Sequence, residues 1–158
     1  MHRTLLTSAL ALAAATGAAQ AEKVFNRIAS FPVASNMAAG EDASRETSSE
    51  IIDVTADGMT LVYTDSPGER LGLIDISDPA TPKAAGVIAL GGEPTSVVVA
   101  DNMALVGIVT SESYDMPSGN LAVVDLAKKE IVARCDLEGQ PDSLAKSPDG
   151  SYVAIAIE

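Results

Sequence analysis

Acidic side chains recur at equivalent positions along this chain, and they are the groups whose type and spacing could do chemistry. Three stand at the start of an apolar run and three at the end of the run that follows: Glu50, Asp65, Glu93, Glu112, Asp142 and Glu158. Two such runs joined by a tight turn form an antiparallel hairpin, so these positions lie at the same end of each hairpin. We therefore expect the six carboxylates at one rim, where oxygen-rich acidic surfaces suit Ca²⁺. The alternative is that they are solvated loop acids.

Side-chain nucleophiles and bases are scarce in this sequence. His2 is the only histidine and Cys135 the only cysteine. Because His2 lies in residues 1–21, which we expect to be removed, the mature chain would hold no Ser-His-Asp triad and no histidine metal site. Cys135 lies in an apolar run, and we expect it to be a small buried hydrophobe. We therefore leave the catalytic residues unknown and assign no cofactor-binding residue.

Five further aspartates are expected to serve the fold. Asp57, Asp101 and Asp149 stand in turns, and Asp75 and Asp125 stand at the ends of apolar runs. Aspartate in such places accepts hydrogen bonds from nearby backbone groups and stabilises the turn. We therefore interpret all five as structural.

The elements that must position these residues repeat with a fixed period. Ser49, Ser96 and Ser143 are spaced 47 residues apart, and each is followed by a turn of the Asp-Gly or Asp-Asn type and another apolar run. Short strands repeated at roughly 40 to 50 residues are typical of β-propeller blades. The sequence therefore predicts an all-β fold, a partial β-propeller of about two and a half four-stranded blades. A catalytic nucleophile would be unique, so the recurring serines are expected to be structural.

Residues 1–21 have the features of a secretory signal peptide. Arg3 precedes an apolar stretch over residues 5–19, and Ala19-Gln20-Ala21 fits the small-residue cleavage rule. The stretch is short for a membrane span, so a retained anchor is the weaker alternative. We expect a periplasmic or secreted product with no membrane span after signal cleavage.

The domain organisation follows from the repeat. Residues 22–48 form a leading segment, in which Val24–Val33 is expected to be a strand that completes the last blade. The partial propeller covers residues 49–158, with blades over 49–92, 93–140 and an incomplete 141–158. The ten strands are expected over 50–54, 59–64, 70–76, 83–90, 96–100, 104–110, 120–126, 130–137, 142–146 and 152–157.

Two features of the blades bear on function. Residues 111–119 lengthen one loop of the second blade, and insertions in repeat arrays often lie on the binding face. The third blade has two strands and would leave an apolar edge unpaired. We therefore expect the N-terminal fragment of a longer propeller, and a naturally short product is the alternative.

Several motifs resemble those of secreted bacterial β-propellers of the YVTN and lactonase-like group. They are Leu-Val-Tyr-Thr-Asp-Ser-Pro-Gly at 61–68, Ile-Asp-Ile-Ser-Asp-Pro at 74–79, Gly-Gly-Glu-Pro-Thr-Ser at 91–96, Gly-Gln-Pro-Asp-Ser at 139–143 and Ser-Pro-Asp-Gly at 147–150. The chain is most similar to the N-terminal part of proteins with esterase-like activity of the phytase family. This resemblance implies a seven-bladed ring with a central channel and ester or phosphoester hydrolysis assisted by Ca²⁺. No catalytic residue of that family can be carried over onto this chain.

Charge excludes one class of partner and leaves two functions open. A protein binds the phosphates of a nucleic acid through clustered Lys and Arg side chains. The net charge of this chain is −12, so we exclude a nucleic-acid partner. One hypothesis is a hydrolase acting on a small-molecule ester or phosphate. The alternative is a non-catalytic propeller module that binds a protein or cell-surface ligand, since one fold carries many functions.

Overall fold

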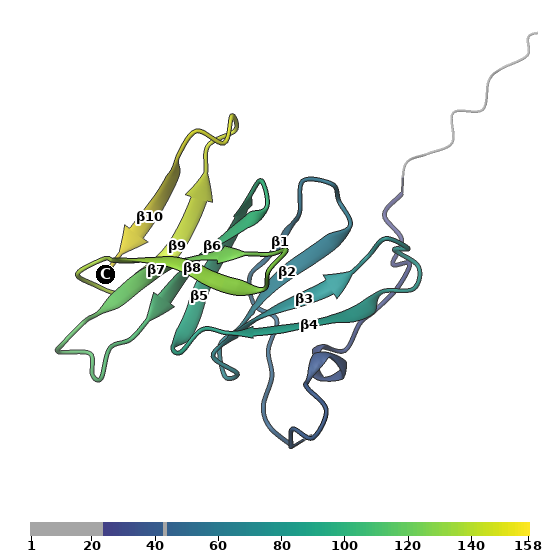
Figure 1. Cartoon of the computed structure of the whole chain (residues 1–158), viewed down its shortest axis with the longest axis horizontal. Helices are drawn as coiled ribbons and strands as arrows, with labels where there is room; N and C mark the ends of the chain where they lie inside the picture. Colours follow the sequence, from purple (N-terminus) through teal and green to yellow (C-terminus); the bar gives the residue numbers. More distant parts are fainter. Residues whose placement is uncertain (1–23, 43) are drawn as a thin grey trace, which may run out of the picture.

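The strands of the described residues form three antiparallel sheets that lie side by side (Figure 1). The computed structural model describes residues 24–42 and 44–158, so the predicted signal peptide over 1–21 lies outside the described residues. Within the described part, no helix is both long enough and apolar enough to cross a membrane.

Each sheet is a meander in which consecutive strands pair. Blade one contains β1 (Ile52–Val54), β2 (Thr60–Asp65), β3 (Arg70–Asp75) and β4 (Lys83–Ala89). Blade two contains β5 (Glu93–Ala100), β6 (Met103–Val109), β7 (Gly119–Asp125) and β8 (Glu130–Asp136). The third sheet pairs β9 (Pro141–Lys146) with β10 (Val153–Ile157). This is the predicted all-β architecture of a partial β-propeller.

Apolar side chains between blades one and two form the core. Blade one contributes Val62, Leu71, Leu73, Ile88 and Leu90. Blade two contributes Val97, Val99, Ala104, Val106, Ile108, Ala122, Val124 and Leu126. Neither sheet could bury this surface alone, so the blades stabilise each other as neighbouring repeats do.

Hydrogen bonds that backbone N–H groups donate to side-chain oxygens also join the sheets. Val99 N donates to Asp53 Oδ2 at 2.7 Å, which links β5 to β1. Leu144 N donates to the buried Ser96 Oγ at 3.1 Å, which links β9 to β5. The recurring serine of blade two is therefore structural, as the repeat predicts.

The expected structural role of four aspartates is confirmed. Asp57 Oδ1 accepts hydrogen bonds from Thr55 Oγ1 at 2.6 Å and Met59 N at 2.9 Å. Asp149 Oδ1 accepts bonds from Ser147 Oγ and Ser151 N in the same way. At the ends of β3 and β7, Asp75 accepts a bond from Ser77 N, and Asp125 accepts bonds from Ala127 N and Lys128 N.

The predicted strand over Val24–Val33 is wrong. Residues 24–32 form no strand, and η1, a 3-10 helix over Val33–Asn36, follows them. Instead of pairing along a sheet edge, Ile28 and Phe31 line a small hollow with Leu61 and Ile74 of blade one. Val24 and Phe25 stay exposed at 65% and 107%, so only the second half of the segment lies against blade one. Strand propensity alone does not decide whether such residues pair in a sheet.

The expectation that Cys135 is buried is also wrong. The Cys135 thiol forms no disulfide and is exposed. It is exposed because β8 is the outermost strand of blade two and faces solvent along most of its length. The pattern correctly predicts a strand there, but it does not show that the strand has a neighbour on one side only.

Candidate functional site

The six predicted carboxylates belong to the end of the sheets where β1, β5 and β9 begin and β2, β6 and β10 end. We call it the rim end. The antiparallel registers place Glu93 opposite Val109 and Pro141 opposite Ile157, as the hairpin argument requires. The structure nevertheless gives the six side chains different surroundings.

Asp65 is buried and already has partners. Its Oδ2 lies 2.7 Å from Arg70 Nε, and its Oδ1 accepts a hydrogen bond from Ser48 N at 2.8 Å. Arg70 also pairs with Glu41 at 2.8 Å. The Arg70 guanidinium, by its hydrogen bond, lowers the pKa of the Glu41 carboxyl. Asp65 therefore belongs to an ion-pair network with the buried Arg70, which the exposed Glu41 completes at the surface, and the Asp65 carboxylate does not face an open rim.

Sequence reasoning missed Arg70 and Glu41. Asp65 and Arg70 stand opposite each other in the β2–β3 register, across the Ser66–Glu69 turn. Opposite charges directly across a hairpin interact in many sheets, so this spacing was a usable signal. Nothing in the sequence links Glu41 to Arg70, because the two residues are 29 positions apart in the chain.

Three of the other carboxylates are on the surface. Glu50 is exposed, and its Oε2 accepts a hydrogen bond from Ser66 Oγ at 2.8 Å. Asp142 and Glu158 are exposed as well. The Glu158 backbone pairs with the backbone of Gln140, which fixes the chain there but leaves the Glu158 side chain on the surface.

Glu93 and Glu112 are the two that the structure brings together. Both line a groove of about 390 Å³, which we call the rim groove. Its other lining residues are Thr95, Val109, Ser111, Ser113, Tyr114 and Gln140. Among the residues that the structure describes, no three His, Cys, Asp or Glu side chains are placed to hold a metal ion. Calcium binding at the rim stays a prediction.

The inserted loop of blade two is an ordered hairpin that forms one side of the rim groove. Thr110 N donates to Ser118 O at 3.0 Å, and Ser118 N donates to Ser111 Oγ at 2.7 Å. Gln140 Nε2 donates to Ser111 Oγ at 2.7 Å, which ties the hairpin to the connection between β8 and β9. These bonds hold the hairpin in one orientation over the groove.

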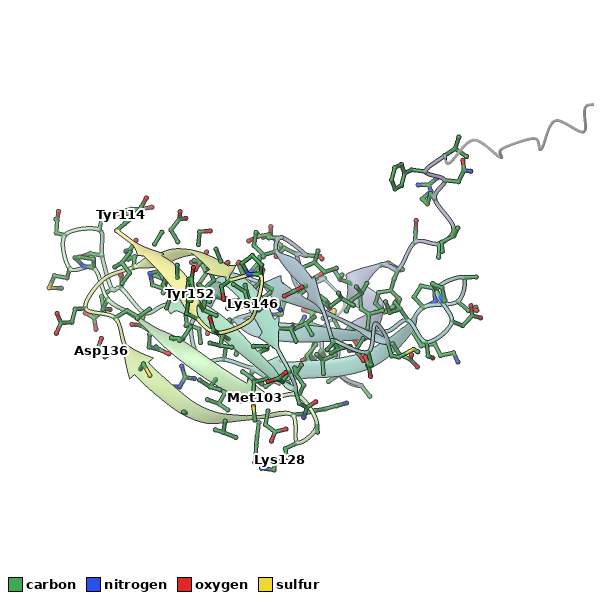
Figure 2. The ribbon with its side chains drawn as sticks, turned by 90° about the horizontal axis from the view of Figure 1, so that it is seen from above. Met103, Tyr114, Lys128, Asp136, Lys146 and Tyr152 are labelled. Carbon is green, nitrogen blue, oxygen red and sulfur yellow. The ribbon has the colours of Figure 1, made fainter. Side chains whose placement is uncertain are left out.

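The tip of this hairpin presents two large side chains to solvent. Tyr114 is 97% exposed and Met116 is 60% exposed. Figure 2 shows Tyr114 at the margin of the molecule, away from Lys128 at the opposite end of blade two. An exposed tyrosine on an ordered element is available to contact a partner, and tyrosine is enriched among the residues that dominate binding energy.

No known protein family and no curated protein match the chain. Among solved structures it is similar to Kuenenia stuttgartiensis hydrazine synthase, with a TM-score of 0.59, 20% sequence identity, and coverage of 70% of this chain and 30% of that chain. It is also similar to a functionally unknown protein from Desulfotomaculum acetoxidans, with a TM-score of 0.53, 15% identity, and coverage of 66% and 31%. The chain thus spans about a third of the length of these structures, and the likeness concerns the fold alone.

Proposed function

We propose that the protein is a non-catalytic β-propeller module that binds an extended, positively charged peptide segment of a partner protein in the rim groove. One observation carries the proposal. The groove combines two carboxylates with an exposed tyrosine on an ordered hairpin, and none of its lining residues is a lysine or an arginine.

Charge complementarity selects the ligand. Glu93 and Glu112 can each accept charge-assisted hydrogen bonds from lysine or arginine, which are stronger than neutral ones. The net charge of −12 adds a long-range attraction that raises the rate of encounter with a cationic partner. Because both carboxylates are exposed, each ion pair alone contributes little, and affinity needs a further anchor.

Tyr114 is well placed to be that anchor. Tyrosine is enriched among the residues that dominate binding energy, and its ring attracts cationic groups through its face. The hydrogen bonds between Ser111 and Ser118 order the hairpin before any ligand arrives. An ordered hairpin loses little conformational entropy on binding, so more of the contact energy appears as affinity.

Hydrolysis of an ester or phosphoester with Ca²⁺, and membership of the YVTN and lactonase-like group, stay predictions from the sequence resemblance. A phosphate group in the rim groove would meet Glu93 and Glu112, so it would need a bound cation to offset their charge. A cationic peptide needs no such addition. The signal peptide stays a prediction from the sequence, and with it we expect the partner in the periplasm or outside the cell.

Calorimetric titration with blocked peptides of alternating Lys and Ser, and of alternating Glu and Ser, tests the proposal. We expect saturable binding of the lysine peptide only, weakened about tenfold by Glu93→Gln combined with Glu112→Gln. Glu130→Gln is the matched control, since Glu130 begins β8 at the opposite end of the blade. Equal binding of both peptides, or equal affinity of the double variant and the control, would contradict the proposal.

A further inference from the structure

Three polar side chains that line the rim groove donate their hydrogen bonds to the fold itself. Thr95 Oγ1 donates to Pro141 O at 2.6 Å, and Ser111 Oγ donates to Ser118 O at 3.0 Å. Gln140 Nε2 donates one of its two hydrogens to Ser111 Oγ at 2.7 Å. Most of the donors in the lining are therefore engaged before a ligand arrives.

The acceptors of the rim groove are left open. Among the described residues, no donor bonds the carboxylates of Glu93 and Glu112 or the Oε1 atom of Gln140. An ionised carboxylate can only accept hydrogen bonds, and the hydroxyls of Ser113 and Tyr114 can accept as well as donate. The groove therefore offers more acceptors than donors, and it suits a ligand that is rich in donors.

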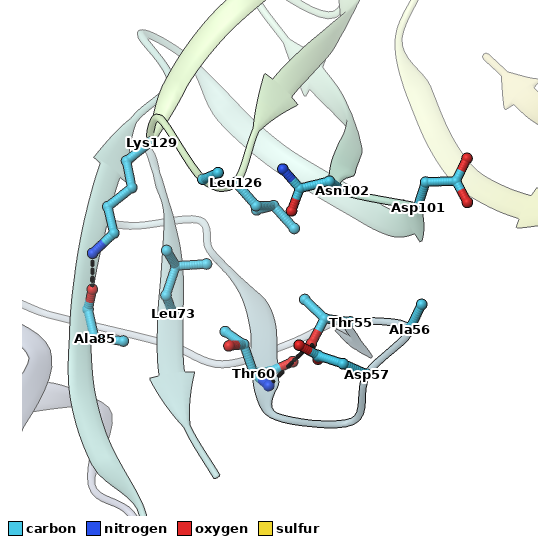
Figure 3. A pocket seen from close by; sticks show the side chains of 11 residues that line it. Thr55, Ala56, Asp57, Thr60, Leu73, Ala85, Asp101, Asn102, Leu126 and Lys129 are labelled. Carbon is cyan, nitrogen blue, oxygen red and sulfur yellow. Dashed lines mark hydrogen bonds between the residues drawn. The ribbon is translucent and has the colours of Figure 1, made fainter. Parts of the chain in front are cut away.

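A second hollow, at the end of the sheets opposite the rim, differs in this respect. It opens between blades one and two and has a volume of about 480 Å³. Figure 3 shows Lys129 at its margin, where Nζ donates to Ala85 O at 2.6 Å, and Asp57 bonded to Thr55. A donor-rich cation would meet the charge of Lys129 there, whereas no lysine or arginine lines the rim groove.

We propose that arginine is the residue that the rim groove recognises in the cationic segment of its partner, an inference that rests on the proposed function. A guanidinium group has five donors and no acceptor. It bonds a carboxylate such as Glu112 through two donors and keeps three for other acceptors, among them Gln140 Oε1. The ammonium of lysine has three donors on one atom and is more strongly hydrated, so it matches fewer acceptors and loses more hydration.

Tyr114 gives a second reason for arginine. It lines the groove together with Glu112, which stands two residues earlier in the same ordered hairpin. Its side chain is 97% exposed, so its ring is open to a ligand. A planar guanidinium stacks on an aromatic face, and its donors point outward in its own plane, so stacking leaves them available for the carboxylate. An ammonium group has no flat face to stack.

Blocked peptides of one length, in which Ser alternates with arginine, lysine or symmetric dimethylarginine, separate donors from charge. Dimethylarginine keeps the positive charge but loses two of the five donors. Calorimetric titration in EDTA excludes divalent ions, which the same oxygens could bind. We expect the arginine peptide to bind about tenfold more tightly than each of the other two. Equal affinity for the arginine peptide and either other peptide would overturn this inference and leave the proposed function standing, whereas no binding of any peptide would overturn both.

A variant of the hairpin tip tests the stacking. Tyr114→Leu keeps an apolar side chain and removes the ring, so the preference for the arginine peptide over the lysine peptide should fall from about tenfold to about threefold. Tyr152→Leu is the matched control, because Tyr152 is 65% exposed and stands just before β10, outside the groove. The control should keep the full preference. An equal preference in the two variants would contradict the role that the proposal assigns to Tyr114.

Discussion

The side-chain amide of Asn36 completes the backbone hydrogen bonding of Gly86, 50 residues away in the chain. Gly86 N donates to Asn36 Oδ1 at 2.9 Å, and Asn36 Nδ2 donates to Gly86 O at 3.0 Å and to Leu73 O at 2.9 Å. These backbone groups lie where the β3–β4 register is interrupted. The amide therefore replaces the ladder bonds that the bulge removes, and it attaches the N-terminal segment to blade one.

Replacing Asn36 with Ala should destabilise the protein. Asn36 is 3% exposed, so its loss leaves buried backbone donors and acceptors without partners, at a cost of about 1–3 kcal/mol. Urea unfolding measures the change, and Asn26→Ala in the exposed part of the same segment is the control. Equal stability of the two variants would contradict a structural role for the amide.

Removing Arg70 should cost more. Arg70→Met leaves Asp65, which is 1% exposed, as a buried charge without its partner, and breaking such a pair typically costs about 3–5 kcal/mol. The double variant Arg70→Met with Asp65→Leu should recover much of this loss, because it removes both charges. Arg27→Met, at an exposed arginine of the N-terminal segment, is the control. Additive effects in the double variant would show that the two residues are not coupled.

The sequence was sufficient for features that depend on neighbours in the chain. The turns at Asp57-Gly58 and Asp149-Gly150 are local, and Gly58 and Gly150 have the positive φ values that such turns require. The strands flanking these turns could therefore be predicted to within one or two residues. The fold class followed because the same unit recurs.

Features that depend on distant partners could not be predicted in the same way. Whether Asp65 faces solvent or Arg70 is decided by the segment around Ser48, which covers it. Whether Val24–Val33 pairs as a strand depends on a distant partner, and in this structure only residues 28–31 of the segment lie against blade one. The groove between Glu93 and Glu112 depends on how the inserted hairpin folds over β5, and periodicity carries no information about that.

Acid should weaken the β9–β10 turn. Hydrogen bonds from Ser147 and Ser151 lower the pKa of Asp149 to about 2, from 3.8. A carboxyl with a lowered folded pKa stabilises the fold above its unfolded pKa, and this contribution is lost as pH falls from about 4 to about 2. Urea midpoints of the parent chain should therefore fall more steeply over this interval than those of Asp149→Ala. Parallel curves would contradict the prediction.

The bond between Ser96 and Leu144 makes the third sheet sensitive to a change in blade two. Ser96→Ala removes the acceptor of the buried Leu144 amide and leaves that donor unpaired, at a cost of about 1–3 kcal/mol. In repeat proteins such a loss falls mainly on the interface concerned, so amide exchange should accelerate in β9 and β10 more than in β1–β4. Ser143→Ala, at the exposed serine of the next repeat, is the control. Hydrogen exchange read by mass spectrometry compares the two variants, and uniform acceleration across all three sheets would show that the chain opens as one unit and not blade by blade.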